Sequence, residues 1–286
     1  MPLRRRLRWL TPYLFLIPGG LWLIVFFVAP MIVMASVSLQ EGSLATGYRL
    51  TWNFAVYGQV INEYLPQFWR SGIYALSVTL LALLFGYPMA YTIAFRGGRA
   101  KNILLLLVIL PFFTAFIIRT LSWKLILADN GFVLGTLKSF GLLDQGFHVL
   151  ASPIAVISGL TYNFLPFMVL PVYVALEKID PHLVEAANDL YASRLQAFLR
   201  VTLPLSMPGI FAGSLLVFIP AVGDFINADI LGSRDTTMIG NVIQRLFLNT
   251  NAYPEASALG FVVMTVVLVL VAIYARVVGA RELTVG

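Results

Sequence analysis

The sequence predicts an all-α membrane protein that crosses the bilayer six times and forms one transmembrane domain over residues 1–286. Of its residues, 59% are hydrophobic and only 11% are charged, and the mean hydropathy is +0.88. A typical soluble domain has about 25% charged residues. Most of this apolar surface must therefore face lipid.

Apolar runs long enough for a hydrocarbon core of roughly 30 Å define the expected spans. The first, residues 13–37, follows a basic cluster at residues 4–8, and small residues at 35–38 would also suit a signal-peptide cleavage site. Because the run exceeds the roughly 7–15 apolar residues of a signal peptide and further spans follow, we expect a retained anchor. The other spans are expected at residues 72–95, 103–127, 153–176, 210–231 and 256–278.

The distribution of positive charge predicts the orientation. With the N-terminus, the 96–101 turn, the 177–206 segment and the C-terminus in the cytoplasm, twelve of the nineteen Lys and Arg residues lie inside. Both termini are then cytoplasmic. Residues 39–70, which are polar and rich in aromatic side chains, become an external loop that lies partly on the membrane surface.

The longest markedly polar segment of the second half is Glu185–Gly209, which lies between two apolar blocks. Asp180 can cap a helix, and Pro181 suits its first turn. Two short apolar stripes follow, and Pro204 and Pro208 end the second. Two short amphipathic helices joined by a bend near a membrane suit a groove on another protein. The alternative is an interfacial helix that rests on lipid headgroups.

Several motifs of enzymes and binding proteins are absent from the sequence. It has no cysteine, no GxxxxGK[ST] loop for ATP and no GxSxG or HExxH motif. His148 and His182 lack ligand spacing, so we expect ordinary surface histidines and no metal site. The Arg clusters flank spans and orient them, which argues against nucleic acid as a partner. We therefore expect no catalytic residue in this chain.

Polar residues at membrane depth are the candidates for a solute pathway, because ionisable groups there are costly and usually face a pathway. The fifth span carries Pro220 and Gly223 close to its polar residues, and irregular backbone is tolerated where protein or water covers it. Unwinding there would bring together side chains that an unbroken helix separates. Asp229 has an alternative role, ending the helix in the headgroup region. The candidates are Asp224, Asn227 and Asp229 in the fifth span and Tyr162 and Asn163 in the fourth.

The outer end of the third span carries two cations, Arg119 and Lys124. Both can extend to the interface, and a pairing with Asp129 would require no function. We expect this interfacial role rather than solute contact. Trp123 is a further pathway candidate, with a place in the interfacial aromatic belt as its alternative.

The polar segment resembles the EAA loop of binding-protein-dependent ABC importer permeases, in which EAA, three residues, Gly and nine residues precede Ile-x-Leu-Pro. Val replaces Ile here without consequence. Tyr191 replaces the Gly, which usually occupies a position of positive φ that Tyr adopts at a cost. Either the bend is built differently or its depth in the partner groove has changed. The resemblance assigns ATPase coupling to Glu185, Ala186, Ala187, Tyr191, Val201, Leu203 and Pro204.

Residues 110–127, 162–180 and 238–249 are similar to the spermidine/putrescine branch of this family. The resemblance implies a type I importer fold in a bacterial inner membrane and a heterodimeric pore with a second related permease. It also implies a solute-binding protein and two ATP-binding subunits that hold ATP and Mg, with no cofactor in this chain. Solute would cross by alternating access.

A polyamine fits the residues, because Asp224 would offset its positive charge and aromatic neighbours would add cation–π attraction of roughly 0.5–2 kcal/mol each. Related permeases carry aminophosphonates, thiamine or ferric iron, which stay alternatives. A secondary transporter without ATP would predict an internal inverted repeat. The 177–206 segment has no counterpart in the first half, and a scaffold without transport leaves the intramembrane Asp and Asn unexplained.

Overall fold

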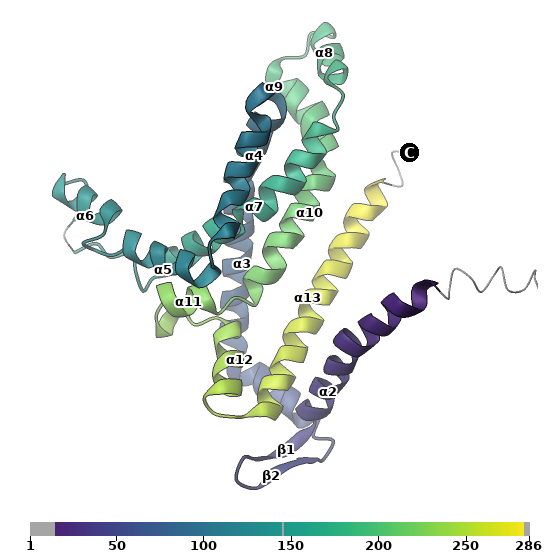
Figure 1. The fold of residues 1–286 in the computed structure, drawn as a ribbon, viewed down its shortest axis with the longest axis vertical. Coiled ribbons are helices and arrows are strands. Elements are labelled where there is room, and N and C mark those ends of the chain that lie inside the picture. Colours follow the sequence, from purple (N-terminus) through teal and green to yellow (C-terminus); the bar gives the residue numbers. More distant parts are fainter. Residues whose placement is uncertain (1–14, 145, 283–286) are drawn as a thin grey trace, which may run out of the picture. The chain divides into compact units, whose positions relative to one another are not determined.

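The computed structural model describes residues 15–144 and 146–282 (Figure 1). The basic cluster at residues 4–8 and the start of the expected first span lie outside the described residues. The chain packs as two compact units. Unit 1 comprises Met1–Glu63 and Ile243–Thr265, and unit 2 comprises Tyr64–Val242 and Val266–Gly286.

Unit 1 begins with a helix of 24 residues, Phe15–Ser38, which is long and apolar enough to cross a membrane. It contains a π-helical turn (Ile24–Val28) and α2 (Ala29–Ser38), and none of its most apolar stretch is buried within the protein. A hairpin of β1 (Gln40–Ser43) and β2 (Gly47–Leu50) follows, with Gln40 opposite Leu50. Gly47 at φ 76° supplies the turn. Part of the expected external loop is therefore regular structure.

Helix α3 (Ala55–Arg96) contains the expected second span and starts 17 residues before the predicted residue 72, within what was expected to be a loop. It is bent at Tyr64, where φ is −106° and ψ is 15°. Pro66 explains the bend, because proline lacks an amide hydrogen and its ring clashes with the preceding turn. The part of α3 after the bend belongs to unit 2.

The expected third span, residues 103–127, is not one straight helix. A short 3₁₀ turn (Gly98–Ala100) precedes α4 (Lys101–Ile109), and a second one (Leu110–Phe113) follows it. The chain is extended at Thr114, and α5 (Phe116–Ile126) leaves at 95° to the preceding helix. Counting this bent pair as one span, the described residues hold six candidate spans; without it they hold five.

The core of unit 2 is built around α7 (Pro153–Glu177) and α10 (Leu203–Val222), which lie side by side (Figure 1). Glycine permits this close approach: a Cβ at Gly209 would lie 2.5 Å from Pro171 O, and one at Gly213 would lie 2.8 Å from Met168 Sδ. Small residues serve the same purpose between other membrane helices. Buried side chains from α3, α7 and α10 fill the centre, among them Val78, Ala82, Leu160, Met168, Val172 and Val217.

The expected fifth span, residues 210–231, is interrupted. Helix α10 ends at Val222, and α11 (Ile226–Leu231) begins after a short non-helical link. This is where Pro220 and Gly223 predicted unwinding. A 3₁₀ turn (Arg234–Thr236), α12 (Ile239–Leu248) and α13 (Tyr253–Glu282) complete the chain, and α13 contains the expected last span.

Four further short elements connect these helices. Helix α6 (Phe132–Ser139) follows α5, while α8 (Pro181–Asp189), α9 (Arg194–Ala197) and a π-helical turn (Phe198–Thr202) lead from α7 into α10. Helices α6 and α8 lie outside the candidate spans, and α9 and the π-helical turn begin the candidate span Arg194–Val222. Figure 1 shows α8 and α9 at one end of the α7–α10 pair, so the segment expected to couple to a partner projects from that end of unit 2.

Candidate functional site

The first half of the coupling candidate is an exposed helix, α8. Asp180 caps it as predicted, since its Oδ1 accepts a hydrogen bond from the His182 amide at 3.0 Å. Glu185 is 69% exposed, and its Oε2 lies 3.2 Å from His182 Nδ1. Ala186 is exposed and Ala187 is half-buried. The EAA triplet therefore stands at the surface of unit 2.

Tyr191 forms the bend in the left-handed conformation, with φ 60°. The Ala192 amide donates to Ala187 O at 3.1 Å, which is the hydrogen bond of a Schellman helix end, where glycine is usual. The bend thus keeps the positive φ that the sequence pattern requires. The Tyr191 side chain is 98% exposed, so packing of this side chain within the described chain does not offset the strain of the backbone. Ser193 then starts α9 with a capping box.

The second half of the segment is anchored to α3. The Phe198 ring lies 5.8 Å from that of Tyr87 and 6.1 Å from that of Tyr91, both edge-on. Ser206 is fully buried, and its Oγ lies 3.0 Å from the Tyr87 hydroxyl. Val201 and Leu203 are half-buried, whereas Pro204 is exposed. A force on the exposed helix α8 would reach α3 through these contacts.

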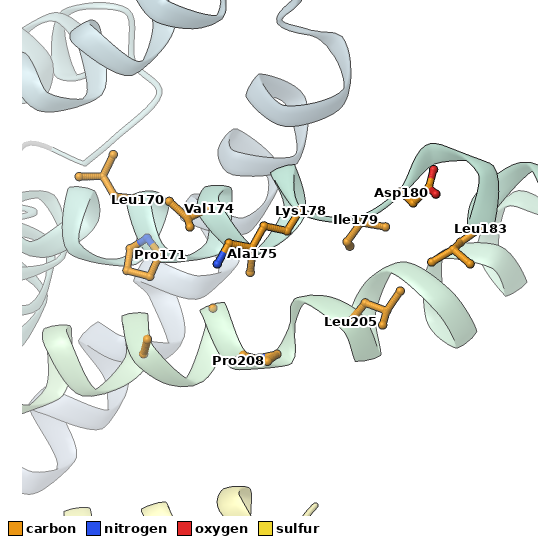
Figure 2. A pocket seen from close by; sticks show the side chains of 12 residues that line it. Leu170, Pro171, Val174, Ala175, Lys178, Ile179, Asp180, Leu183, Leu205 and Pro208 are labelled. Atoms are coloured by element: carbon orange, nitrogen blue, oxygen red, sulfur yellow. The ribbon is translucent and has the colours of Figure 1, made fainter. Parts of the chain in front are cut away.

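A groove of about 770 Å³ lies between the C-terminal end of α7 and the N-terminal end of α10 (Figure 2). Figure 2 shows Leu205 and Pro208 of α10 across from Ile179 and Leu183. Lys178 and Asp180 are the charged residues among its lining. Because the lining is otherwise apolar, the groove lacks the converging polar groups of a hydrophilic solute site.

Four polar side chains in the middle of unit 2 form one chain of hydrogen bonds. Arg119 Nε donates to Asn163 Oδ1 at 2.5 Å, and Asn163 Nδ2 donates to Asn227 Oδ1 at 2.8 Å. Asn227 Nδ2 donates to Asp224 Oδ2 at 3.1 Å, and the Asn227 amide donates to Asp224 Oδ1 at 2.8 Å. All four side chains are at least nine-tenths buried. We call this set the polar relay.

The relay joins Arg119 of α5, Asn163 of α7, Asp224 in the link after α10 and Asn227 of α11. The two charged ends do not touch, and two amides connect them. Thr120 on α5 supports the relay, since its Oγ1 accepts from Asn163 Nδ2 at 3.2 Å and donates to Asn227 Oδ1 at 3.3 Å. Buried charges require such partners, because an unpaired one is expensive.

The interfacial role expected for Arg119 is therefore wrong: its side chain is 7% exposed and points into the protein. Asp129 pairs instead with Lys138 Nζ at 3.1 Å and His148 Nδ1 at 2.7 Å. The hydrogen bond from Lys138, followed by that from His148, lowers the pKa of the Asp129 carboxyl below its usual value of 3.8. Lys124 is exposed.

The remaining pathway candidates do not take part in the hydrogen bonds that form the relay. Trp123 and Tyr162 contact each other edge-on, with ring centroids 5.3 Å apart. Asp229 is exposed on α11 and does not join Asp224 and Asn227. Sequence analysis missed Arg119 and Thr120 as relay members. The one signal for Arg119 was a charge within an apolar stretch, which suits an interfacial side chain equally well.

A pocket of about 550 Å³ adjoins the arginine end of the relay. The Arg119 Cζ lies 5.5 Å from the ring centroid of Phe112 and 5.4 Å from that of Phe116, and its Nη1 donates to Pro111 O at 2.7 Å. The break between α4 and α5 opens this space. Its lining consists of Phe112, Phe113, Thr114, Ala115, Phe116, Arg119, Asn163, Phe164 and Phe167.

The described part of the chain has no cluster of three or more His, Cys, Asp or Glu side chains suited to a metal ion. His148 and His182 each pair with one carboxylate and are mostly exposed. The relay and its adjoining pocket place buried charged and polar groups beside an aromatic-lined space.

Comparisons with known proteins agree with this geometry. Residues 82–282 match the family model of the binding-protein-dependent transport system inner membrane component. The chain is 38% identical to the spermidine/putrescine transport system permease protein PotB of Haemophilus influenzae, over 89% of this chain and 90% of that protein. It is 36% identical to PotB of Escherichia coli strain K12, over 89% and 93%.

A solved structure shares the fold. It is the crystal structure of a bacterial ABC transporter involved in the import of the acidic polysaccharide alginate, with a TM-score of 0.72 and 24% identity over 97% of this chain and 98% of that one. The family binds no cofactor itself, and ATP hydrolysis lies in separate subunits. Given the family match and these relatives, the chain belongs to the binding-protein-dependent inner membrane components: it is a multi-pass permease subunit of an ABC importer that acts with a periplasmic binding protein.

Proposed function

We propose that this permease imports a small cationic solute of the polyamine class, spermidine or putrescine, by alternating access. The observation that carries the proposal is the identity of 38% and 36% to two spermidine/putrescine permeases over 89% of the chain. The buried carboxylate of Asp224 supports it, because a carboxylate at membrane depth offsets the hydration that a polyamine loses on entry.

The alternative is another small solute, such as an aminophosphonate, thiamine or ferric iron. The alginate importer has the same fold and carries an acidic polysaccharide, so the fold by itself leaves the solute open.

The assembled transporter is proposed to contain a second, related permease, two ATP-binding subunits and the binding protein. The two units of this chain would form one transmembrane domain of six spans there, with α4 and α5 as the third span. Both termini and the 177–206 segment would face the cytoplasm, which accords with the distribution of Lys and Arg.

The coupling role is proposed for the two halves of the segment that follows α7. Glu185, Ala186 and Ala187 on exposed α8 would dock on an ATP-binding subunit, and Tyr191 would insert beside them. Val201, Leu203 and Pro204 would carry the movement into α10. Contacts of Phe198 with α3 support this division, because they leave α8 free while they hold the second half in place.

The solute pathway is proposed to run past the polar relay, with Asp224, Asn227 and Asn163 as polar contacts. Tyr162 and Trp123 would form an aromatic wall, and Asp229 would attract the cation at the exposed surface. Among these, Asp224 has the strongest physical support, since it is the buried anion at the end of the relay.

The test is the ATPase activity of the reconstituted complex with its binding protein and a panel of solutes. Stimulation by spermidine or putrescine is expected, and Asp224→Asn should reduce it. Stimulation by an aminophosphonate, thiamine or ferric iron, with none by polyamines, would reject the polyamine proposal and keep the importer.

A further inference from the structure

The surroundings of the Arg119 guanidinium have the chemistry of a binding site for an ammonium group. Two carbonyl oxygens accept its hydrogen bonds, Pro111 O at 2.7 Å and Asn163 Oδ1 at 2.5 Å. Two aromatic faces, Phe112 and Phe116, lie within the range of about 6 Å at which rings attract cations. Among the described residues no carboxylate lies within ion-pair distance of the guanidinium.

Negative charge reaches this site indirectly, through the relay. The amide of Asn163 directs its oxygen toward Arg119 and its nitrogen toward Asn227. The amide of Asn227 repeats this orientation, with its nitrogen toward Asp224. Two aligned amide dipoles therefore carry the influence of the Asp224 carboxylate to the oxygen that accepts from Arg119, and hydrogen bonds in such chains polarise one another. The site is built to hold one positive charge.

We propose that Arg119 is a tethered occupant of a cation site, and that a primary ammonium group of the transported solute replaces its guanidinium when the side chain swings away. The inference rests on the proposed polyamine function. The exchange keeps one positive charge among the same acceptors, so no uncompensated charge is buried at any stage. Phe113, Phe164 and Phe167 line the adjoining pocket of about 550 Å³, which offers apolar space for the methylene chain of a polyamine.

The experiment empties the site and offers it a free cation. Arg119→Ala is prepared in the complete complex without binding protein, and its apparent Tm is measured with ethylammonium, putrescine or the uncharged 1,4-butanediol. We expect the cations to raise the Tm of the variant by about 2–4 °C at saturating concentration, because a ligand that binds only the folded state stabilises it. Butanediol should have no effect. Wild type and Arg119→Lys should respond much less, because their own side-chain cation competes for the site in the absence of the binding protein.

A second variant keeps the test decisive if Arg119→Ala does not assemble. Arg119→Gln removes the charge but retains an amide donor, and its Tm should rise with ethylammonium in the same direction. Asp224→Asn combined with either variant should abolish the rise, because it removes the charge at the far end of the relay. Equal shifts in wild type and variant, or no shift in both Arg119 variants, would overturn the proposal.

The two proposals fail separately. Ethylammonium probes the cation site alone, whereas polyamine stimulation of the wild-type ATPase probes the solute. If ethylammonium raises the Tm of an Arg119 variant but polyamines do not stimulate the wild-type ATPase, the cation site is kept and the polyamine proposal is rejected. If polyamines stimulate the wild-type ATPase but ethylammonium raises the Tm of neither Arg119 variant, the polyamine proposal is kept and the proposed cation site at Arg119 is rejected.

Discussion

Replacement of Asn227 by Leu tests whether the polar relay holds α5, α7 and α11 together. The Asn227 side chain is fully buried and makes three hydrogen bonds: it donates to Asp224 and accepts from Asn163 and Thr120. Leu has a similar branched shape but is larger, and it makes none of them. Asp224 would keep only the backbone donor of residue 227 among these bonds.

The magnitude follows from the groups left behind. A lost hydrogen bond to a charged group costs about 1.5–3 kcal/mol, and a neutral buried donor without a partner costs about 1–3 kcal/mol. Asn163 and Thr120 keep the hydrogen bond between them, so the free-energy cost of unpaired neutral groups is small. We expect a destabilisation of about 2–4 kcal/mol, which corresponds to a Tm lower by roughly 5–15 °C for a chain of this size.

The assay is the apparent Tm of the purified complex, followed through this subunit. Asn249→Leu is the matched control, because Asn249 is exposed and surface substitutions usually stay within about 0.5 kcal/mol. If Asn227→Leu lowers the Tm no more than Asn249→Leu does, the relay does not exist as described.

Three further outcomes are expected. Glu185→Arg should leave membrane insertion intact but abolish co-purification of the ATP-binding subunits. Asp235→Arg, an exposed control outside the coupling segment, should leave co-purification unchanged. Normal co-purification of the Glu185→Arg variant would contradict the docking role. Tyr191→Gly should keep the association with the ATP-binding subunits, and Tyr191→Ile should weaken it, because a β-branched residue adopts φ 60° poorly. Equal co-purification of the two variants would argue against a role for the left-handed bend in docking. The lowered pKa of Asp129 means that its carboxylate, and with it the ion pair to Lys138, is fully present above its ordinary pKa of 3.8 and is lost only as pH falls through the lowered value. Asp129→Asn should therefore speed amide hydrogen exchange in α6, relative to wild type, by the same factor at pH 5 and pH 8. A difference between variant and wild type that is confined to pH 8 speaks against the pairing.

Hydropathy predicts that long apolar helices are present, because lipid requires them whatever their partners, but it does not predict where they begin or break. Local signals also succeed: Asp180 caps α8, and Tyr191 has the positive φ that its place in the pattern requires. The interruption after Val222 follows from Pro220 and Gly223 near polar residues.

The direction of a side chain depends on partners that are distant in sequence, and here prediction fails. Arg119 points inward because Asn163, 44 residues later, offers an acceptor that only the packing of α5 on α7 brings close. The 95° bend before α5 has a single local signal, Pro111, which bends many helices far less. The coupling and pathway roles of the individual residues stay predictions.

The central claim is that this permease forms part of a polyamine importer, and uptake into proteoliposomes tests it most directly. The complete complex, with binding protein outside and ATP inside, should accumulate labelled spermidine or putrescine, and Glu185→Arg should abolish the uptake. Robust ATP hydrolysis stimulated by the loaded binding protein without any polyamine uptake would contradict the claim.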